Sequence, residues 1–181
     1  MRRMFLFVTL LVLLAATNAA AQATSSTPNH SEALARLWTE VGGKVIDMAE
    51  DFPEEKYDFK PTPEVRSFAE QMLHVAGGNY LFMDLAQGKR PGAEDLSREK
   101  YKTKAEIVAV LKKSVEEGAA FIRQQGDAGL AKAVKFPWSQ TPTNGTGLWG
   151  EAIGHVGEHY GQLVVYYRVN GLVPPASRPR R

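Results

Sequence analysis

Histidine is the residue type in this sequence whose spacing most clearly suggests chemistry. His155 and His159 stand four residues apart within residues 154–162. Residues four apart on an α-helix lie one above the other on the same face, so the two imidazoles can converge on one point. Neutral imidazole is the most common metal ligand in proteins. Because the chain has only four histidines, the pair is a stronger signal than it would be in a histidine-rich sequence.

A third histidine, His74, lies about two turns into its own predicted helix, while His155 and His159 lie two to three turns into theirs. If these two helices run parallel, as alternate helices of an up-and-down bundle do, all three imidazoles sit at one level. We therefore predict a three-histidine site for a divalent metal. The alternative for each histidine is a hydrogen-bonded or surface role, which we would favour for His74 taken alone. His30, in a polar segment, is predicted to be solvated.

The helical stripes around these histidines are more polar than a bundle core should be. Glu70 and Gln71 share one stripe, and Glu151 and Gln162 share the other. Burying a polar group without a partner costs about 1–3 kcal/mol, so several together suggest a site. In the parallel geometry Glu70 and Glu151 both lie one turn nearer the mouth of the site, where either could accept a proton or orient a ligand. Gln162 would support a ligand, and Glu158 is left as a surface or supporting group.

The surroundings of the predicted site have room for a ligand. Gly77 and Gly78 follow His74 closely and would leave space beside a metal. Trp138 and Tyr57 fall on the two segments predicted to cap the outer end of the site. Either aromatic side chain could line a pocket, although a structural role is equally compatible with its position.

Four stretches have the apolar periodicity of helices and must position these residues. They cover residues 31–52, 67–87, 103–123 and 148–170. The second and third open with capping boxes, Ser67 with Glu70 and Thr103 with Glu106. Residues 124–147 are predicted to be mostly irregular, with a short extended run at 131–136. Four long helices without convincing strand pairs predict an all-α protein, a four-helix bundle.

The start of the chain has the pattern of a secretory signal peptide over residues 1–21. Arg2 and Arg3 precede an apolar run, and small residues follow it before Gln22. The apolar run is shorter than the ~18–20 residues that span a bilayer, which makes a transmembrane anchor the weaker alternative. We therefore expect export, to the periplasm or out of the cell, with no membrane attachment after cleavage. Residues 22–30 are predicted to be a flexible lead-in, 31–173 the bundle domain and 174–181 a tail.

Charge and cysteine content exclude some classes of function. The chain has 22 Lys and Arg against 20 Asp and Glu, and loss of the two arginines of the signal peptide makes it neutral. A neutral chain without a basic stripe gives no reason to expect nucleic-acid binding. The chain has no cysteine, so it forms no disulfide, offers no thiol nucleophile, and must hold any metal through histidine, carboxylate or water.

Three segments of the sequence together resemble the DinB superfamily, a group of DinB/YfiT-like proteins. They are residues 67–74 (Ser-Phe-Ala-Glu-Gln-Met-Leu-His), residues 155–163 (His-x3-His-Tyr-Gly-Gln-Leu) and residues 167–175 (Tyr-Arg-Val-Asn-Gly-Leu-Val-Pro-Pro). The resemblance implies a four-helix bundle of the opposite hand to the usual up-and-down arrangement. It also implies a divalent metal, often zinc or nickel, held by His74, His155 and His159.

The resemblance further implies that some relatives are thiol-dependent transferases or isomerases that use cytosolic thiols such as bacillithiol or mycothiol, and that many dimerise. The predicted export signal sets this chain apart from relatives that use a cytosolic thiol. A homodimer is accordingly one expected assembly.

Three hypotheses for function follow. The first is a metal-dependent enzyme of transferase or hydrolase type, acting on an unknown small molecule at an open position of the metal, where bound water has a pKa of ~7 on zinc. The second is a non-catalytic periplasmic metal- or ligand-binding module, in which Glu70 or Glu151 fills that position. The third is a plain structural bundle whose histidines bind no metal.

Overall fold

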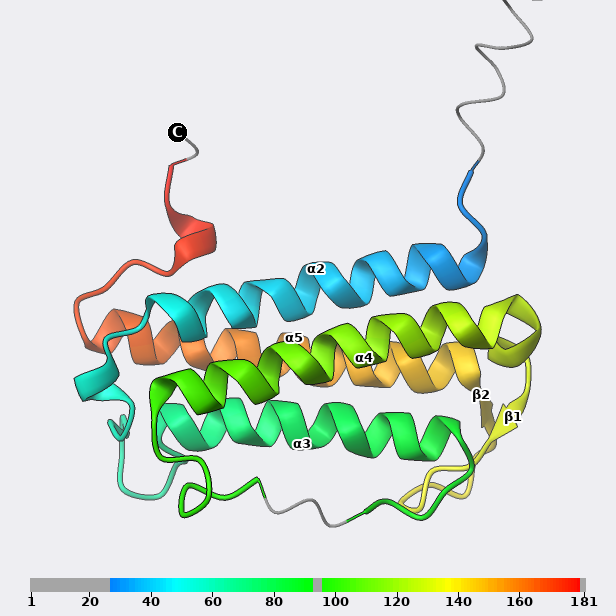
Figure 1. The fold of residues 1–181 in the computed structure, drawn as a ribbon, viewed down its shortest axis with the longest axis horizontal. Coiled ribbons are helices and arrows are strands. Elements are labelled where there is room, and N and C mark those ends of the chain that lie inside the picture. Colours follow the sequence, from blue (N-terminus) through cyan, green and yellow to red (C-terminus); the bar gives the residue numbers. More distant parts are fainter. Residues whose placement is uncertain (1–26, 93–95, 180–181) are drawn as a thin grey trace, which may run out of the picture.

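The computed structural model describes residues 27–92 and 96–179. Within them lie four long helices, which form the bundle of Figure 1. These are α2 (His30–Asp51), α3 (Phe68–Ala86), α4 (Lys104–Leu130) and α5 (Gly145–Val169). Two single turns of 3-10 helix, η1 (Glu54–Lys56) and η2 (Pro175–Ser177), and two short strands, β1 (Ala133–Val134) and β2 (Thr143–Asn144), complete the described elements. The predicted all-α four-helix bundle is confirmed, whereas the predicted signal peptide, 1–21, and most of the lead-in, 22–30, lie outside the described residues.

The directions of the helices differ from those of an up-and-down bundle. In Figure 1, α2 and α5 run one way, and α3 and α4 run the other. The parallel pairing of α3 with α5 that the sequence suggested is therefore wrong. The connection from residue 87 to residue 103 makes this topology possible. At up to ~3.3 Å per residue it is easily long enough to return along α3, which has 19 residues and a length of about 28 Å.

The helix starts follow the local sequence signals. Ser67 and Glu70 form the predicted capping box, with the Ser67 side chain accepting from the Glu70 backbone N–H and the Glu70 side chain accepting from the Ser67 backbone N–H. Thr103 and Glu106 do the same at the start of α4. These reciprocal bonds satisfy backbone donors that have no partner within the helix. They fix where α3 begins, and thus which of its residues face the site.

The segment 124–147 contains more structure than its glycines and prolines suggest. The helix α4 continues to Leu130 because Gly126, at φ 59° and ψ 178°, bends the chain and lets the helix resume. The strand β1 lies within the predicted extended run and pairs antiparallel with β2. Asn144 then caps α5 by accepting a hydrogen bond from the Gly147 backbone N–H at 3.0 Å. The last helix therefore begins at Gly145, three residues earlier than predicted.

The core of the bundle is rich in aromatic side chains. Trp38 and Trp149 meet edge to face at 5.4 Å between ring centroids, and the Trp38 indole N–H donates to the Val115 carbonyl at 2.8 Å. Tyr57, predicted as a pocket-lining option, is instead buried in this core, where its hydroxyl donates to the Ala49 carbonyl. No helix in the described part of the chain is long and apolar enough to cross a membrane.

Candidate metal centre

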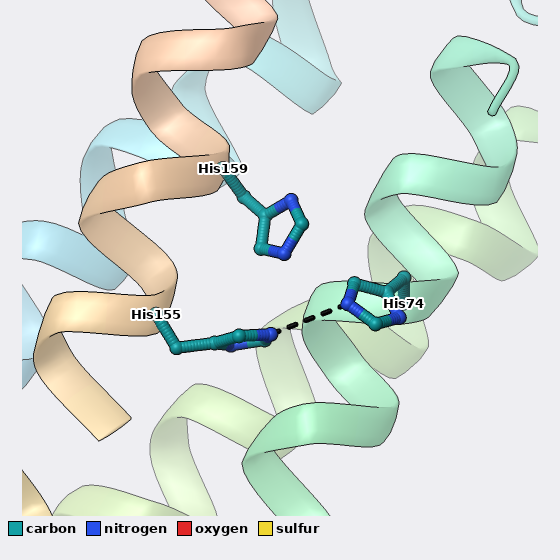
Figure 2. Close-up of side chains that lie close together, drawn as sticks. All are labelled: His74, His155 and His159. Carbon is teal, nitrogen blue, oxygen red and sulfur yellow. Dashed lines mark hydrogen bonds between the residues drawn. The ribbon is translucent and has the colours of Figure 1, made fainter. Parts of the chain in front are cut away.

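The three histidines of the predicted site lie together. His74 projects from α3, and His155 and His159 project from α5 toward it (Figure 2). One ring nitrogen from each can be chosen so that all lie within 4.8 Å of one another. The Nε2 atoms of His74 and His155 are 3.3 Å apart. The sequence prediction that these three side chains share one site is confirmed as a spatial grouping.

The reason for their meeting differs from the one that the sequence suggested. Gln71, early in α3, contacts Tyr166, late in α5. Phe82, late in α3, contacts His155, near the middle of α5. Increasing residue number along α3 thus corresponds to decreasing number along α5, so the two helices are antiparallel. In antiparallel helices, residues at the same distance from the helix start do not lie at the same height in the bundle. The equal depth of the histidines in their helices therefore does not explain why they meet. They meet because the layer of α3 that carries His74 lies opposite the middle of α5.

A pair of glutamines holds one of the rings in a defined state. His159 Nδ1 is 2.9 Å from Oε1 of Gln71, and Nε2 of Gln71 donates to Oε1 of Gln162 at 3.0 Å. The second bond assigns the amide oxygen of Gln71 to the side facing His159, which must then carry its proton on Nδ1. The Nε2 atom is left with a free lone pair that faces His74 and His155. Gln162 has the predicted supporting role, but it acts on His159 through Gln71. The one indication of Gln71 in the sequence is its place on the same helical stripe as His74.

A glycine makes room for the ring of His155. A Cβ atom added at Gly78 would lie 2.5 Å from Cε1 of this ring, closer than real Cβ contacts come. The neighbouring Gly77 has an ordinary distance of 3.6 Å between such a Cβ and Leu96. Of the two glycines that the sequence analysis singled out, Gly78 is therefore the one that the position of His155 requires.

The local electrostatics keep the three rings neutral. Burial lowers the pKa of His74 to about 4, with further lowering by the charge of Arg66 and by His155. Burial, then His155 and His74, lower the pKa of His159 to about 4. The pKa of His155 is also lowered, first by burial, while the charges of Glu158 and Glu151 oppose the shift. At neutral pH the rings are therefore in the unprotonated form that binds metals.

The residues present fit a divalent ion. Two ligands at 2.0–2.1 Å from a tetrahedral zinc lie about 3.3–3.4 Å apart, and the Nε2 atoms of His74 and His155 are separated by 3.3 Å. Nδ1 of His155 is buried without a hydrogen-bond partner among the described residues. The position of this ring therefore depends on packing and on the contact of its Nε2 with His74. Three neutral imidazoles whose ring nitrogens lie within 4.8 Å of one another form a donor set suited to zinc, nickel or a similar ion.

His74 and His155 line a cleft of about 840 Å³, and His159 is buried beside them. Its walls are α3 and α5, part of the connection between α3 and α4, and Trp138 from the loop after β1. Of the two roles left open for Trp138, the structure shows it lining the cleft. The wall formed by residues 96–99 was not predicted, because a polar connection gives no sign that it folds back over a site.

The two carboxylates predicted to be catalytic both line this cleft, but they do not converge. Glu70 precedes His74 by one turn of α3, and Glu151 precedes His155 by one turn of α5. Because the helices are antiparallel, the two side chains flank the histidines from opposite directions. The expectation that both lie on the same side, nearer one mouth, is wrong.

Glu70 is held by its neighbours in the helix cap. Its carboxylate accepts from the Ser67 backbone N–H at 2.6 Å and lies 3.3 Å from the Lys60 ammonium. These contacts, the Ser67 backbone bond first, lower the pKa of Glu70. Glu151, in contrast, is exposed and has no hydrogen bond or ion pair to the described residues. It is the freer of the two carboxylates to meet a ligand.

Comparison with solved structures gives the same fold. A DinB-like protein from Bacillus cereus has a TM-score of 0.66 and 16% identity, with 78% of this chain and 93% of that chain covered. The DinB-like YjoA of Bacillus subtilis gives 0.64 and 20%, covering 82% and 99%. YfiT of Bacillus subtilis, described as a probable metal-dependent hydrolase with an unusual four-helix bundle topology, gives 0.62 and 15%, covering 82% and 92%.

A comparison with curated protein sequences gave no significant match. The model of the DinB superfamily matches residues 37–163, which include all three histidines and most of the bundle. The resemblance inferred from the histidine segments is thereby confirmed: the chain belongs to the DinB superfamily.

Proposed function

We propose that this protein is a divalent-metal-dependent enzyme of hydrolase or transferase type that acts on a small molecule bound in the cleft. The observation that carries the proposal is the convergence of three neutral imidazoles, two of which, His74 and His155, line an open cleft. The description of YfiT as a probable metal-dependent hydrolase supports the same class of reaction.

In this proposal His74, His155 and His159 hold the ion through the nitrogens that face one another. A divalent ion such as zinc, when bound, supplies a Lewis acid and lowers the pKa of its water to ~7. Gln71 keeps His159 in the tautomer whose Nε2 is free, and Gly78 leaves the space that His155 occupies. Such supporting contacts orient ligands and commonly change metal affinity 10- to 100-fold when removed.

We assign the role of proton acceptor to Glu151. Its carboxylate lines the cleft one turn from His155 and is not held by the described residues. Glu70 lines the same cleft, but its engagement with Ser67 and Lys60 favours a role in capping α3. Glu151→Gln should therefore lower turnover with little change in metal content, whereas Glu70→Gln should mainly lower the free energy of unfolding.

The alternative of a non-catalytic metal-binding module is less well supported. It requires a carboxylate from the chain to fill the remaining position of the metal. Among the described residues, the group of potential ligands within reach of one another contains the three histidines and no carboxylate. An ion held there would keep at least one position for water or substrate.

Metal analysis of the chain without residues 1–21 tests the proposal. We expect about one zinc or nickel ion per wild-type chain after loading and dialysis, and loss of this ion in His155→Ala. His30→Ala is the matched control, because His30 is an exposed histidine at the start of α2 and should leave the metal content unchanged. Equal metal content in wild type and His155→Ala would end the proposal.

A cobalt-loaded sample separates an open site from a closed one. Visible absorption of Co²⁺ depends on the number and type of its ligands, so addition of cyanide or a small thiol should change the spectrum if a position is exchangeable. A closed binding module would show no change.

Two further proposals concern where the protein acts and how it assembles. We propose that residues 1–21 direct export and that the mature chain works outside the cytoplasm, which cell fractionation and N-terminal sequencing would test. A homodimer, as implied by the family, is testable by light scattering of the mature chain.

A further inference from the structure

The charges that line the cleft are not equivalent. Arg98 is committed, since its guanidinium donates to the Asp58 carboxylate at 2.8 Å and to nearby backbone carbonyls. The Arg66 guanidinium has no hydrogen bond or ion pair with residues 27–92 or 96–179; only its backbone carbonyl is used, by the Tyr166 hydroxyl. Arg66 nevertheless lines the cleft. It is therefore a cation that is available to a ligand.

The charge of Arg66 reaches the histidines. It lowers the pKa of all three rings, which places the guanidinium within electrostatic range of the predicted ion. An arginine in such a position can bind a carboxylate or similar anion through two parallel hydrogen bonds.

A different kind of surface lies toward the other end of the cleft. The indole of Trp138 is 56% exposed, although large apolar side chains are normally covered. It stacks on Phe136 at 5.1 Å between centroids and 20° between planes, and it meets the edge of Phe82 at 6.5 Å. Phe82 in turn packs against His155. This arrangement presents a flat, supported aromatic face beside the histidines, suited to an uncharged planar group.

The two features lie on opposite sides of the histidines. Phe82 is eight residues after His74 in α3, or about 12 Å along the helix at 1.5 Å per residue. Arg66 lies two residues before the start of α3 at Phe68, which is six residues, or about 9 Å, on the other side of His74. A ligand that meets both features must therefore be elongated, and its middle must pass over His74 and His155, the two histidines that line the cleft.

Acidic residues distinguish the two ends further. Glu151 lies toward the start of α5, on the side of His155 where Phe82 and Trp138 lie. Glu158, also exposed, lies three residues after His155 and therefore toward the Arg66 end, where the Glu70 carboxylate is paired with Lys60. Like charges repel, so Glu151 disfavours an anion near the aromatic end, while the unpaired guanidinium of Arg66 favours one at the other end. Arg66 and Glu151 thus favour one orientation of an asymmetric ligand.

From this arrangement, and resting on the proposed function, we propose that the cleft binds an elongated small molecule with a single anionic group. The anion binds Arg66, the uncharged planar end stacks on Trp138, and the bond to be changed lies between them, beside His74 and His155.

Three matched probes test this with zinc-loaded protein: N-benzoylglycine, its neutral amide N-benzoylglycinamide, and the cation N-(2-aminoethyl)benzamide. They share the planar group and differ in the charge at the other end. Quenching of tryptophan fluorescence reports binding, because Trp38 and Trp149 are buried in the core and Trp138 is exposed. We expect the anion to bind about tenfold more tightly than the amide, with the cation weakest.

Variants identify the residues responsible. Arg66→Gln should reduce the affinity for N-benzoylglycine to that for the amide, and Arg66→Lys should retain part of the preference. Arg98→Gln is the matched control, since this second arginine of the cleft is already paired, and it should leave the preference intact. Trp138→Leu, followed by calorimetry, should weaken all three probes by a similar factor of about 3 to 10.

Two outcomes would overturn the inference. If the preference for the anion survives Arg66→Gln, the ion and not the arginine selects it. If the cation binds best, the carboxylates dominate the cleft. Both results leave the proposed function intact, because metal binding by the three histidines is measured separately on the same samples. Loss of metal from the wild type would instead end the proposed function itself.

Discussion

A methyl group at Gly78 should disrupt the metal centre, whereas one at Gly77 should not. In Gly78→Ala the new Cβ would lie 2.5 Å from Cε1 of His155, and ordinary contacts of this kind begin near 3.4 Å. The ring must therefore move by about 1 Å, several times the ~0.2 Å tolerance of metal–ligand distances. In Gly77→Ala the new Cβ would be 3.6 Å from Leu96, an ordinary contact.

The expected loss of affinity can be bounded. Removal of a group that only supports a ligand weakens metal binding about 10- to 100-fold. Displacement of a ligand itself should cost at least about 100-fold, or ~2.7 kcal/mol at 1.4 kcal/mol per tenfold. Both substitutions replace a helical glycine by alanine, which favours α3 by up to ~1 kcal/mol. General loosening of the helix therefore cannot account for weaker binding.

The assay is a competition titration of zinc against a chromophoric chelator, with circular dichroism to confirm that both variants fold. Wild type and Gly77→Ala should bind zinc with similar affinity, and Gly78→Ala should bind it far more weakly. If Gly78→Ala binds as tightly as Gly77→Ala, His155 is not a ligand in the position described, and the reasoning is refuted.

Two other predictions concern stability. Gly43→Ala should raise the free energy of unfolding by up to ~1 kcal/mol, because a Cβ there has open space. Gly42→Ala should lower the free energy of unfolding by about 1–2 kcal/mol, because its Cβ would lie 2.8 Å from the stiff side chain of Val115. Urea unfolding of metal-free protein tests this pair, and equal effects would contradict the packing described. The metal-free protein should also lose stability as pH falls from about 6.5 toward 4. Folding lowers the pKa values of His74 and His159 from 6.5 to about 4. The unfolded chain therefore binds more protons than the folded chain in that range, and falling pH favours unfolding. Urea midpoints that stay constant over this window in wild type, or that fall equally in a variant lacking both histidines, would contradict the burial of the two rings.

The sequence was sufficient to predict the four helices and the grouping of the three histidines of the proposed metal site. Periodicity and the two capping boxes located the helices, because these are local properties of the chain. The spacing of His155 and His159 was enough to identify a shared face, since helix geometry fixes it. His74 was grouped with them by its polar stripe and by its depth in its helix, and the second argument assumed parallel helices, which is wrong.

Helix direction could not be predicted in the same way. A connection as long as residues 87–103 permits either direction for the next helix, so nothing local decides between the topologies. The error in direction explains the error about Glu70 and Glu151, which were expected on one side of the site. The extension of α4 past Gly126 was missed because a glycine with positive φ is as compatible with ending a helix as with bending it. The role of Arg66 could not be predicted from the sequence, because it depends on the guanidinium having no hydrogen-bond or ion-pair partner among the described residues.

The three histidines belong to only two helices, and residues 74 and 155 are 81 positions apart in the chain. An ion bound by the histidines of both helices would link α3 to α5. The chain has no cysteine with which to form a disulfide between them. For a disulfide closing a loop of this length, chain entropy corresponds to about 4–5 kcal/mol. Part of the resistance of the bundle to unfolding would then come from the bound metal, with α4 inside the closed loop of chain and α2 outside it.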